Sequence, residues 1–364
     1  MTPSGGGGEH AGGKASAVAP ATNVGLQRKI ETLRCPDIYS EGAHTVDVRE
    51  SHMSWVFLTE QFAYKMKKPV KFPRLDFSTL ALRHMQCENE LVLNRRLAPA
   101  VYLGLVRMTC DEKGRISLDG EGETVEWLVR MVRLPTERKL ERLVGEGRVK
   151  GDEIMADIAT AAELLIRFYR PAPPVHMPAD EYRQRFVNEI ASITAELLSP
   201  HFDLPADIID CASAPLQAFV AKKAALLEGR ARWVIDAHGD LRPQHIYVGP
   251  DPAIIDCLEF DRDLRLRDPL DELSFLRLEC DRLGDPRPGD LFIERYRQAL
   301  DDPAPAELIR FYAAFRAYER AKLAIGHLEG PDSPDPACAA KWRERTLTYL
   351  RLAEAYSVPK WYSG

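Results

Sequence analysis

The chain has 364 residues, of which 45% are hydrophobic and 29% are charged, and its formal net charge is -6. This length allows either two modest domains or one bilobal domain. The negative net charge lacks the basic excess of nucleic-acid binders, so we do not expect a nucleic acid as partner. No run of residues approaches the ~20 apolar residues of a membrane helix, so we do not expect a membrane protein. The seven cysteines are scattered, which is typical of reduced thiols in a cytoplasmic protein.

The first part of the chain reads as a tail followed by a β-rich lobe. Residues 1–26 are mostly Gly, Ala, Ser and Pro, and we predict a disordered tail because they bury too little apolar surface. A helix is expected over residues 78–97, with Ser78 as its N-cap. Alternating β-branched and aromatic residues between turn residues predict five strands, at 54–59, 62–67, 101–109, 115–118 and 124–134.

Beyond Pro135 the pattern becomes mainly helical. Helical spacing marks residues 136–144, 152–169, 179–198 and 214–227, and again the region from Asp268 to near the end. Short strand signals return at 233–236, 246–248 and 253–258. We therefore predict a bilobal α+β fold. A small antiparallel β lobe with one helix would span residues 27–135, and a larger mainly helical lobe would span residues 136–364.

Two aspartates stand where the helical lobe returns to short strands. Asp240 and Asp256 each follow an apolar run, and a hairpin of 246–248 with Ile254 would bring both to one cleft. Phosphoryl transfer from ATP needs one carboxylate beside the acceptor hydroxyl and a second one on the metal. His245 follows Asp240 by five residues, where a second metal ligand is expected. The set at these spacings predicts a phosphotransferase site.

The run His238-Gly239-Asp240-Leu241-Arg242-Pro243-Gln244-His245 resembles the catalytic loop of the aminoglycoside phosphotransferase family, whose fold is protein-kinase-like. Residues 255–260 resemble its magnesium segment, and 268–273 its following helix entry. The resemblance implies an ATP- and Mg²⁺-dependent kinase that phosphorylates a hydroxyl group of a small molecule. It also implies the roles of four residues: Asp240 as general base or orienting carboxylate, Asp256 as magnesium ligand, His238 as support of the loop, and Asp271 as the acceptor that holds the loop backbone.

In the small lobe, Phe62-Ala63-Tyr64-Lys65 is similar to the kinase strand whose lysine grips the phosphates, and Glu90 is similar to the helix residue that pairs with this lysine. Lys65 and Lys67 lie on the same strand face, because side chains alternate with period two. The small Ala63 favours Lys65, and Lys67 remains the alternative. Glu88 is expected to face solvent.

Three further segments, 54–58, 93–99 and 316–318, are similar to a bacterial subfamily of unassigned substrate, in which an additional P-loop kinase domain is frequent. The P-loop motif Gly-x-x-x-x-Gly-Lys-Ser/Thr does not occur in this sequence. The expected phosphate-loop turn at 50–54 also contains no glycine.

His245 is the main departure, because the family usually has asparagine at this position. An oxygen ligand suits Mg²⁺, whereas imidazole suits softer ions such as Mn²⁺. Three readings stay open: a metal ligand, a contact of the γ-phosphate or loop, or a one-metal site held by Asp256 alone. The alternative function is a nucleotide-binding pseudokinase or regulatory module without efficient transfer.

The acceptor and the oligomeric state are left open by the sequence. Glu259, Asp261 and Asp263 would either attract a cationic acceptor or form a solvated loop with ion pairs to the arginines between them. Arg316 and Arg320 would either bind an anionic acceptor or pair with this acidic loop.

Overall fold

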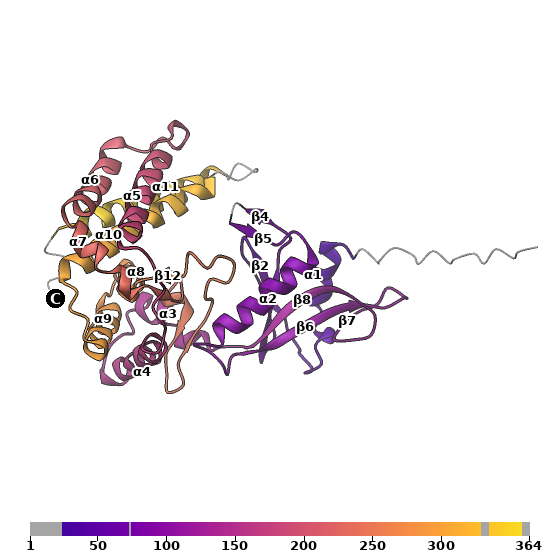
Figure 1. The fold of residues 1–364 in the computed structure, drawn as a ribbon. Helices are drawn as coiled ribbons and strands as arrows, with labels where there is room; N and C mark the ends of the chain where they lie inside the picture. Colours follow the sequence, from indigo (N-terminus) through magenta and orange to yellow (C-terminus); the bar gives the residue numbers. More distant parts are fainter. Residues whose placement is uncertain (1–23, 73, 329–334, 359–364) are drawn as a thin grey trace, which may run out of the picture.

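The computed structural model describes residues 24–72, 74–328 and 335–358. The predicted tail over residues 1–26 lies outside the described residues except for its last three, and Leu26 begins a helix. The chain forms two lobes that lie side by side, a β-rich lobe and a helical lobe (Figure 1). Within the described residues, no helix has the length and apolar character of a membrane span.

The small lobe is built on an antiparallel six-stranded sheet with the order β1-β2-β3-β8-β6-β7. All five predicted strands are confirmed to within two residues. Three further strands, β1, β4 and β5, are only two to four residues long and were not predicted. The strands are β1 (Asp47–Glu50), β2 (Ser54–Leu58), β3 (Phe62–Lys67), β6 (Tyr102–Cys110), β7 (Ile116–Leu118) and β8 (Glu123–Val132), with a separate hairpin of β4 (Lys71–Phe72) and β5 (Leu75–Asp76).

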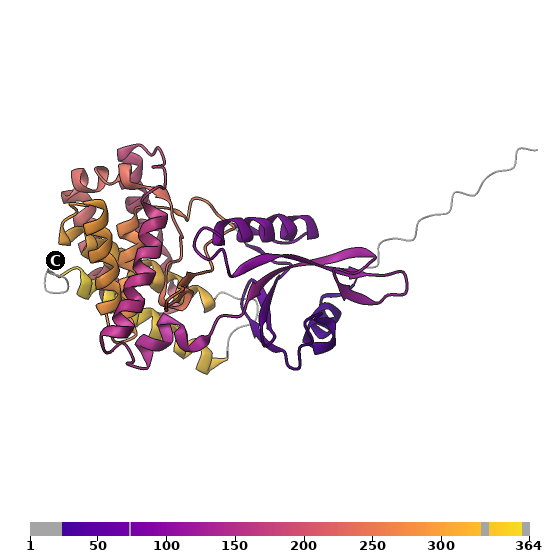
Figure 2. The same cartoon turned by 90° about the horizontal axis from the view of Figure 1, so that it is seen from below.

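Two helices, α1 (Leu26–Arg34) and α2 (Leu80–Asn94), cover opposite faces of this sheet (Figure 2). The prediction of one helix was therefore wrong, because the helical spacing of Leu26, Ile30 and Leu33 in the nine-residue α1 was overlooked. The N-cap of α2 is Thr79, whose hydroxyl accepts from the Leu82 amide at 3.2 Å. Ser78 does not cap the helix, since its hydroxyl donates to Asp76 instead.

A buried ion cluster joins both helices to the sheet. Glu126 of β8 accepts from Lys29 of α1 at 2.9 Å and from the Arg83 guanidinium of α2 at 2.8 and 2.9 Å. All three residues are buried. Because a buried charge without partners is costly, this cluster requires both helices in place.

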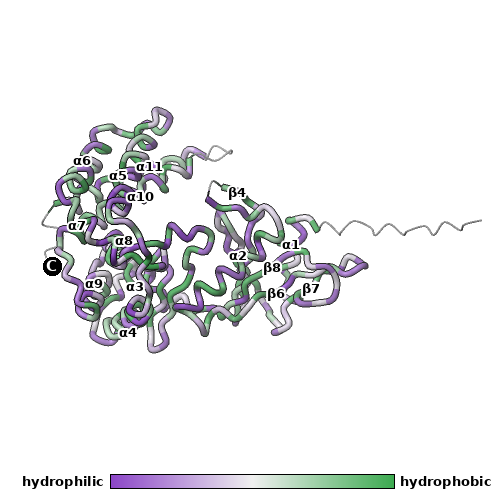
Figure 3. Tube along the Cα trace, viewed as in Figure 1, coloured by the Kyte–Doolittle hydropathy of each residue, from purple (hydrophilic) through white to green (hydrophobic). Residues whose placement is uncertain are grey.

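The large lobe is a helical bundle around one continuous apolar core. Its hydrophobic and hydrophilic residues alternate along the helices, as expected for elements with one buried face (Figure 3). The segment predicted as one helix over 214–227 is divided in the structure between two helices, α6 (Ala206–Lys222) and α7 (Ala224–Glu228). Helix α6 begins eight residues earlier than predicted and contains Pro215. The helices are α3 (Leu140–Gly145), α4 (Asp152–Tyr169), α5 (Ala179–Leu197), α6 (Ala206–Lys222), α7 (Ala224–Glu228), α8 (Pro269–Arg282), α9 (Arg287–Leu300), α10 (Ala306–Ile325) and α11 (Pro336–Tyr356).

Four short strands flank the segment of residues 238–245 in the large lobe. The predicted hairpin is confirmed, since β10 (Ile246–Tyr247) pairs with β11 (Ala253–Ile254) and Ile246 lies opposite Ile254. The strand β9 (Ile235–Asp236) pairs with β12 (Leu266–Arg267), a two-residue strand that was not predicted. The residues between β9 and β10 therefore form a loop that is anchored at both ends.

Candidate active site

The loop of residues 238–245 is shaped by a buried histidine and a glycine. His238 accepts from the Asp240 amide through Nδ1 at 3.3 Å, so its Nε2–H donates to the Ile255 carbonyl at 2.9 Å. Burial lowers the pKa of His238, which keeps the ring neutral in this role. Gly239 has φ of +89°, and a Cβ there would lie 3.1 Å from Leu258 Cδ1. His238 thus joins the loop to the segment before Asp256.

Glu272, and not Asp271, holds the backbone of this loop. Its carboxylate accepts from the amides of His238 at 3.3 Å and Gly239 at 2.5 Å. Asp271 instead forms a bidentate pair with Arg316, with both distances 2.6 Å. The role predicted for Asp271 was therefore wrong. One residue along a helix turns the side chain by about 100°, and this turn directs the longer Glu272 toward the loop.

The Asp240 carboxylate has one occupied and one open oxygen. Its Oδ2 accepts from Arg242 Nη2 at 2.6 Å and lies 3.7 Å from His245 Nδ1. Among the described residues, none donates a hydrogen bond to Oδ1. Burial would raise the pKa of Asp240, but Arg242 and the other positive groups nearby together outweigh burial and lower it. Asp240 is therefore ionised at neutral pH.

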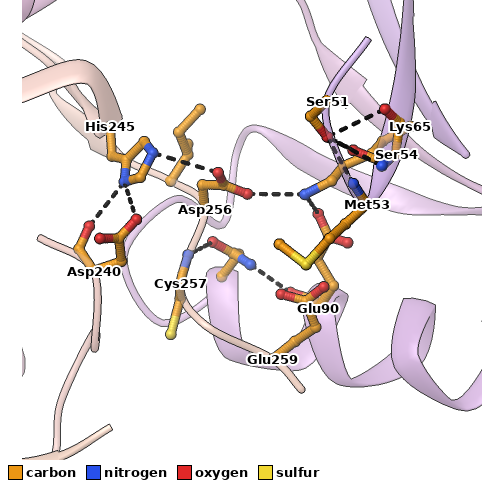
Figure 4. Close-up of polar contacts among 12 residues, drawn as sticks. Ser51, Met53, Ser54, Lys65, Glu90, Asp240, His245, Asp256, Cys257 and Glu259 are labelled. Atoms are coloured by element: carbon orange, nitrogen blue, oxygen red, sulfur yellow. Dashed lines mark hydrogen bonds and ion pairs between the residues drawn. The ribbon is translucent and has the colours of Figure 1, made fainter. Parts of the chain in front are cut away.

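His245 lies between Asp240 and Asp256 (Figure 4). Its Nδ1–H donates to the Asp240 carbonyl at 2.8 Å, so Nε2 carries the lone pair of the neutral ring. Nε2 accepts from the Gln244 side-chain amide at 3.0 Å and lies 3.4 Å from Asp256 Oδ2. Burial lowers the pKa of His245 to about 4 and outweighs the two carboxylates. The ring is thus neutral at pH 7, and the electron pair of its Nε2 is engaged by the Gln244 amide beside Asp256.

Asp256 follows β11 in a left-handed conformation, with φ of +63°. Its Oδ1 accepts from Lys65 at 2.8 Å, and its side chain is 46% exposed. Burial of the group would raise the pKa of Asp256, but Lys65, His245 and Arg242 together outweigh burial and lower it strongly. Its amide donates to the Tyr102 hydroxyl at 3.2 Å, which helps to hold the unusual backbone. The carboxylate is therefore charged and accessible.

Both candidate lysines contact Glu90, which is completely buried. Lys65 lies 2.9 Å from Glu90 and also contacts Asp256, whereas Lys67 lies 2.7 Å from Glu90 and 2.5 Å from Glu259. Burial would lower the pKa of Lys65, but Asp256 and Glu90 raise it well above its ordinary value. The structure thus joins both lysines to the predicted glutamate, and only Lys65 to Asp256.

Two of the three carboxylates in the acidic segment after Asp256 are paired with the small lobe, whereas Asp263 is exposed. Glu259 pairs with Lys67, and Asp261 pairs with Arg74 of the small lobe at 2.8 Å. The expectation of a cationic acceptor beside these residues is therefore not supported by their positions. Their charges are used to hold the two lobes together.

Sequence reasoning missed two residues near the end of α2 that bind the loop region. Asn94 Oδ1 accepts from the Cys257 amide at 2.9 Å, and its Nδ2 donates to the Glu90 carbonyl at 2.8 Å. Arg96 donates to the carbonyls of Asp236 at 3.0 Å and Ala237 at 2.9 Å. A polar residue on the buried face of an amphipathic helix was the available signal. These contacts fix the end of α2 against the segments that flank the loop of residues 238–245 and Asp256.

The turn between β1 and β2 has a serine in place of a glycine-rich loop. Ser51 Oγ accepts from the amides of Met53 at 3.3 Å and Ser54 at 3.0 Å (Figure 4). These amides are therefore engaged by the turn itself. A phosphate group would have to displace Ser51 to bind them.

The metal-ligating potential of the site is limited to a few side chains. Within the described ranges, no group of three or more His, Cys, Asp or Glu residues is arranged to hold a metal ion. Asp256 and His245 offer two donors on the same side of the loop. A cation held here would need further ligands from phosphate oxygens or water.

No protein-family model matches the chain. Over 292 residues the chain is 32% identical to uncharacterized proteins of Mycobacterium tuberculosis and Mycobacterium bovis. The match covers 76% of this chain and 54% of each relative, so the chain spans about half the length of the curated relatives it matches.

Among solved structures, the chain is similar to a choline/ethanolamine kinase family protein from Mesorhizobium loti. The TM-score is 0.52 at 14% identity, over 90% of this chain and 98% of that chain. A glucosamine kinase in complex with glucosamine, ADP and inorganic phosphate is more distant, with a TM-score of 0.43 at 14% identity over 89% of this chain and 81% of that chain. The first of these likenesses confirms, at the level of the fold, the resemblance that the catalytic loop had indicated.

Proposed function

We propose that this chain, which has the fold of a choline/ethanolamine kinase family protein, is an ATP-dependent phosphotransferase. It would move the γ-phosphate to a hydroxyl group of a small molecule. The observation that carries the proposal is the meeting of four residues from distant parts of the sequence: Lys65, Asp240, His245 and Asp256 form one continuous chain of contacts. Phosphoryl transfer depends mainly on positioning and on charge, and this arrangement supplies both.

Asp240 is proposed to orient the acceptor. Arg242 holds Oδ2, which leaves Oδ1 for the hydrogen bond from the acceptor hydroxyl. The lowered pKa of the carboxyl keeps it ionised, so it accepts this hydrogen bond at neutral pH. The hydroxyl proton would pass to Asp240 as the oxygen bonds to phosphorus.

Lys65 is proposed to bind the phosphates of ATP. Its contact with the accessible Asp256 carboxylate supports this choice over Lys67, which is 1% exposed and enclosed by Glu90 and Glu259. Lys67 would then position Glu90, which in turn positions Lys65. The pKa of Lys65 is raised, so the phosphates would meet a charged ammonium group.

Asp256 and His245 fit a divalent cation. His245 Nε2 and Asp256 Oδ2 lie 3.4 Å apart, and these two groups would hold the cation together with phosphate oxygens or water. The proton on Nδ1 is held by a backbone carbonyl, as in known metal-ligating histidines. When bound, Mg²⁺ or Mn²⁺ would neutralise charge on the ATP phosphates, and the imidazole would favour Mn²⁺.

A second candidate is a nucleotide-binding module without efficient transfer. The observation in its favour is that the Gln244 amide occupies His245 Nε2 and that Ser51 occupies the amides of its turn. Both groups would have to move before the phosphates and a metal are fully held.

The two candidates differ in acceptor-dependent release of ADP. We would measure it with Mg²⁺ and with Mn²⁺ for the wild type, Asp240→Asn and His245→Asn, and measure ADP affinity in parallel. For a kinase, Asp240→Asn should lower kcat by about 10²- to 10⁴-fold with ADP affinity retained. His245→Asn should raise the ratio of Mg²⁺- to Mn²⁺-supported activity. ATP binding without transfer to any hydroxyl compound in a broad panel would instead support the binding module.

A further inference from the structure

A second polar cluster lies in the large lobe, where helix α10 packs against α8 and α11 (Figure 1). Arg320 of α10 lies 6.0 Å from the ring of Phe275 in α8 and 5.8 Å from the ring of Tyr349 in α11. Arg345 of α11 lies 6.0 Å from the same tyrosine ring. Two guanidinium groups therefore share one aromatic platform, in the range of cation–π contacts.

This cluster is adjacent to the proposed base. Phe275, which Arg320 contacts, follows Glu272 by about one turn of α8, and Glu272 accepts hydrogen bonds from the loop amides of His238 and Gly239. Helix α8 also contacts Pro243–His245. Arg320 therefore lies beside the loop that carries Asp240, although it forms no ion pair with Asp240. An acceptor whose hydroxyl lies at Asp240 would extend toward Arg320.

The acidic residues of this region are already paired. Glu279 pairs with Arg282 at 3.0 Å and accepts from the Tyr349 hydroxyl at 2.7 Å. Glu319 pairs with Arg316 at 2.8 Å. These carboxylates therefore have no free charge with which to bind a cationic acceptor.

The two arginines of the platform have no such compensation. Within the described part of the chain, neither Arg320 nor Arg345 lies within 4.0 Å of a carboxylate oxygen, and the buried Nε of Arg320 has no hydrogen-bond partner. A buried hydrogen-bond donor without a partner is unfavourable, because it has lost its contact with water. An anion beside these groups would offset that cost.

The small lobe contacts the edge of this cluster. His52, in the turn between β1 and β2, lies with its ring 5.0 Å from that of His327, which stacks on Trp342 of α11 at 3.7 Å. Arg345 lies 5.7 Å from the Trp342 ring. The cluster thus lies along the boundary of the two lobes, next to the turn that would cover the ATP phosphates.

We propose that Arg320 and Arg345 recognise an anionic group on the acceptor, so that the substrate is a hydroxyl compound that also carries a carboxylate or a phosphate. Guanidinium groups bind both anions through paired hydrogen bonds, and the aromatic platform holds the guanidinium planes in place. A cationic amine would meet unpaired positive charge at the same position. This inference rests on the proposed function, because it assigns the acceptor of that reaction.

The reaction keeps its atoms in balance. The acceptor hydroxyl oxygen forms a bond to the γ-phosphorus, and the bond from that phosphorus to the β–γ bridging oxygen breaks. ADP leaves with the bond's electron pair, and the hydroxyl proton passes to Asp240 and then to solvent. Arg320 and Arg345 bind the remote anion and take no part in these bond changes.

Matched acceptors test the proposal. We would compare D-glucuronate, D-glucose and D-glucosamine, and likewise glycerol 3-phosphate, glycerol and 2-amino-1,3-propanediol, by ADP release with Mn²⁺. The anionic member of at least one set should have the highest kcat/KM, and Arg320→Gln should lower that value by about tenfold or more, with less than about threefold effect on the neutral member. Arg343→Gln, an exposed arginine of α11, is the control for charge. A preference for the cationic or neutral members in both sets would overturn the proposal.

Binding separates this inference from the proposed function. D-glucuronate, glycerol 3-phosphate and inorganic sulfate would each be titrated calorimetrically into the ADP- and Mn²⁺-saturated protein. Saturable binding of at least one, weakened about tenfold or more by Arg320→Gln, is expected even if no transfer occurs. Anion binding without transfer would contradict the kinase reaction and leave the anion site standing. Transfer to neutral or cationic acceptors, with no anion bound, would contradict the anion site alone.

Discussion

Replacement of Glu90 by glutamine tests how far the lysine cluster stabilises the small lobe. Glu90 contacts Lys65 at 2.9 Å and Lys67 at 2.7 Å, and all three groups are buried or nearly so. Removing one partner of a buried pair costs about 3–5 kcal/mol when the remaining charge has no other partner. Here Lys65 keeps its contact with Asp256 and Lys67 keeps its contact with Glu259. We therefore expect a smaller loss, of about 2 kcal/mol, in the free energy of unfolding.

The assay is urea denaturation followed by circular dichroism, with ADP affinity measured in parallel. Glu88→Gln is the matched control, because Glu88 lies on the same helix, is 57% exposed and lies 3.5 Å from His84. This control should change stability by less than about 0.5 kcal/mol. ADP should bind the Glu90→Gln protein several-fold more weakly, because Lys65 loses the carboxylate that positions it.

A double-mutant cycle with Lys67→Met measures the coupling directly. Contacting residues usually show coupling energies of about 0.5–3 kcal/mol. If Glu90→Gln were within about 0.5 kcal/mol of the wild type, or if the cycle showed no coupling, the reasoning about this cluster would be refuted.

Two further predictions concern the catalytic-loop region. Glu272→Gln should lower kcat by about tenfold or more with little change in ADP affinity, because a side-chain amide then meets the Gly239 amide. Equal losses in kcat and in ADP affinity would instead indicate general unfolding. Burial raises and Arg265 lowers the pKa of Asp236, and the net shift is downward. The stabilisation that ionised Asp236 gives to the folded protein is therefore fully present above its pKa in the unfolded chain, about 3.9. It is lost as the pH falls through the lower pKa that Asp236 has in the folded protein. Asp236→Asn should cost about 1–2 kcal/mol at pH 7 in urea denaturation and less at pH 3.5, and a pH-independent difference would contradict this account.

The sequence was sufficient where local pattern and spacing decide the outcome. Runs of β-branched and aromatic residues between turn residues located β3 and β8, because such residues favour the extended backbone of a strand. The spacing of Asp240, His245 and Asp256 indicated one site, because a hairpin of short strands lies between them and allows few arrangements.

Tertiary structure decided which of several adequate side chains performs each role. Asp271 and Glu272 are neighbours in sequence, and only the orientation of α8 directs Glu272 toward the loop. Glu259 could be read as an acceptor ligand until the packing of the lobes placed it against Lys67. Arg320 belongs to a helix whose arginines look alike in sequence. Its charge is available because the surrounding carboxylates pair with other residues, and such pairing depends on distances that no local pattern encodes.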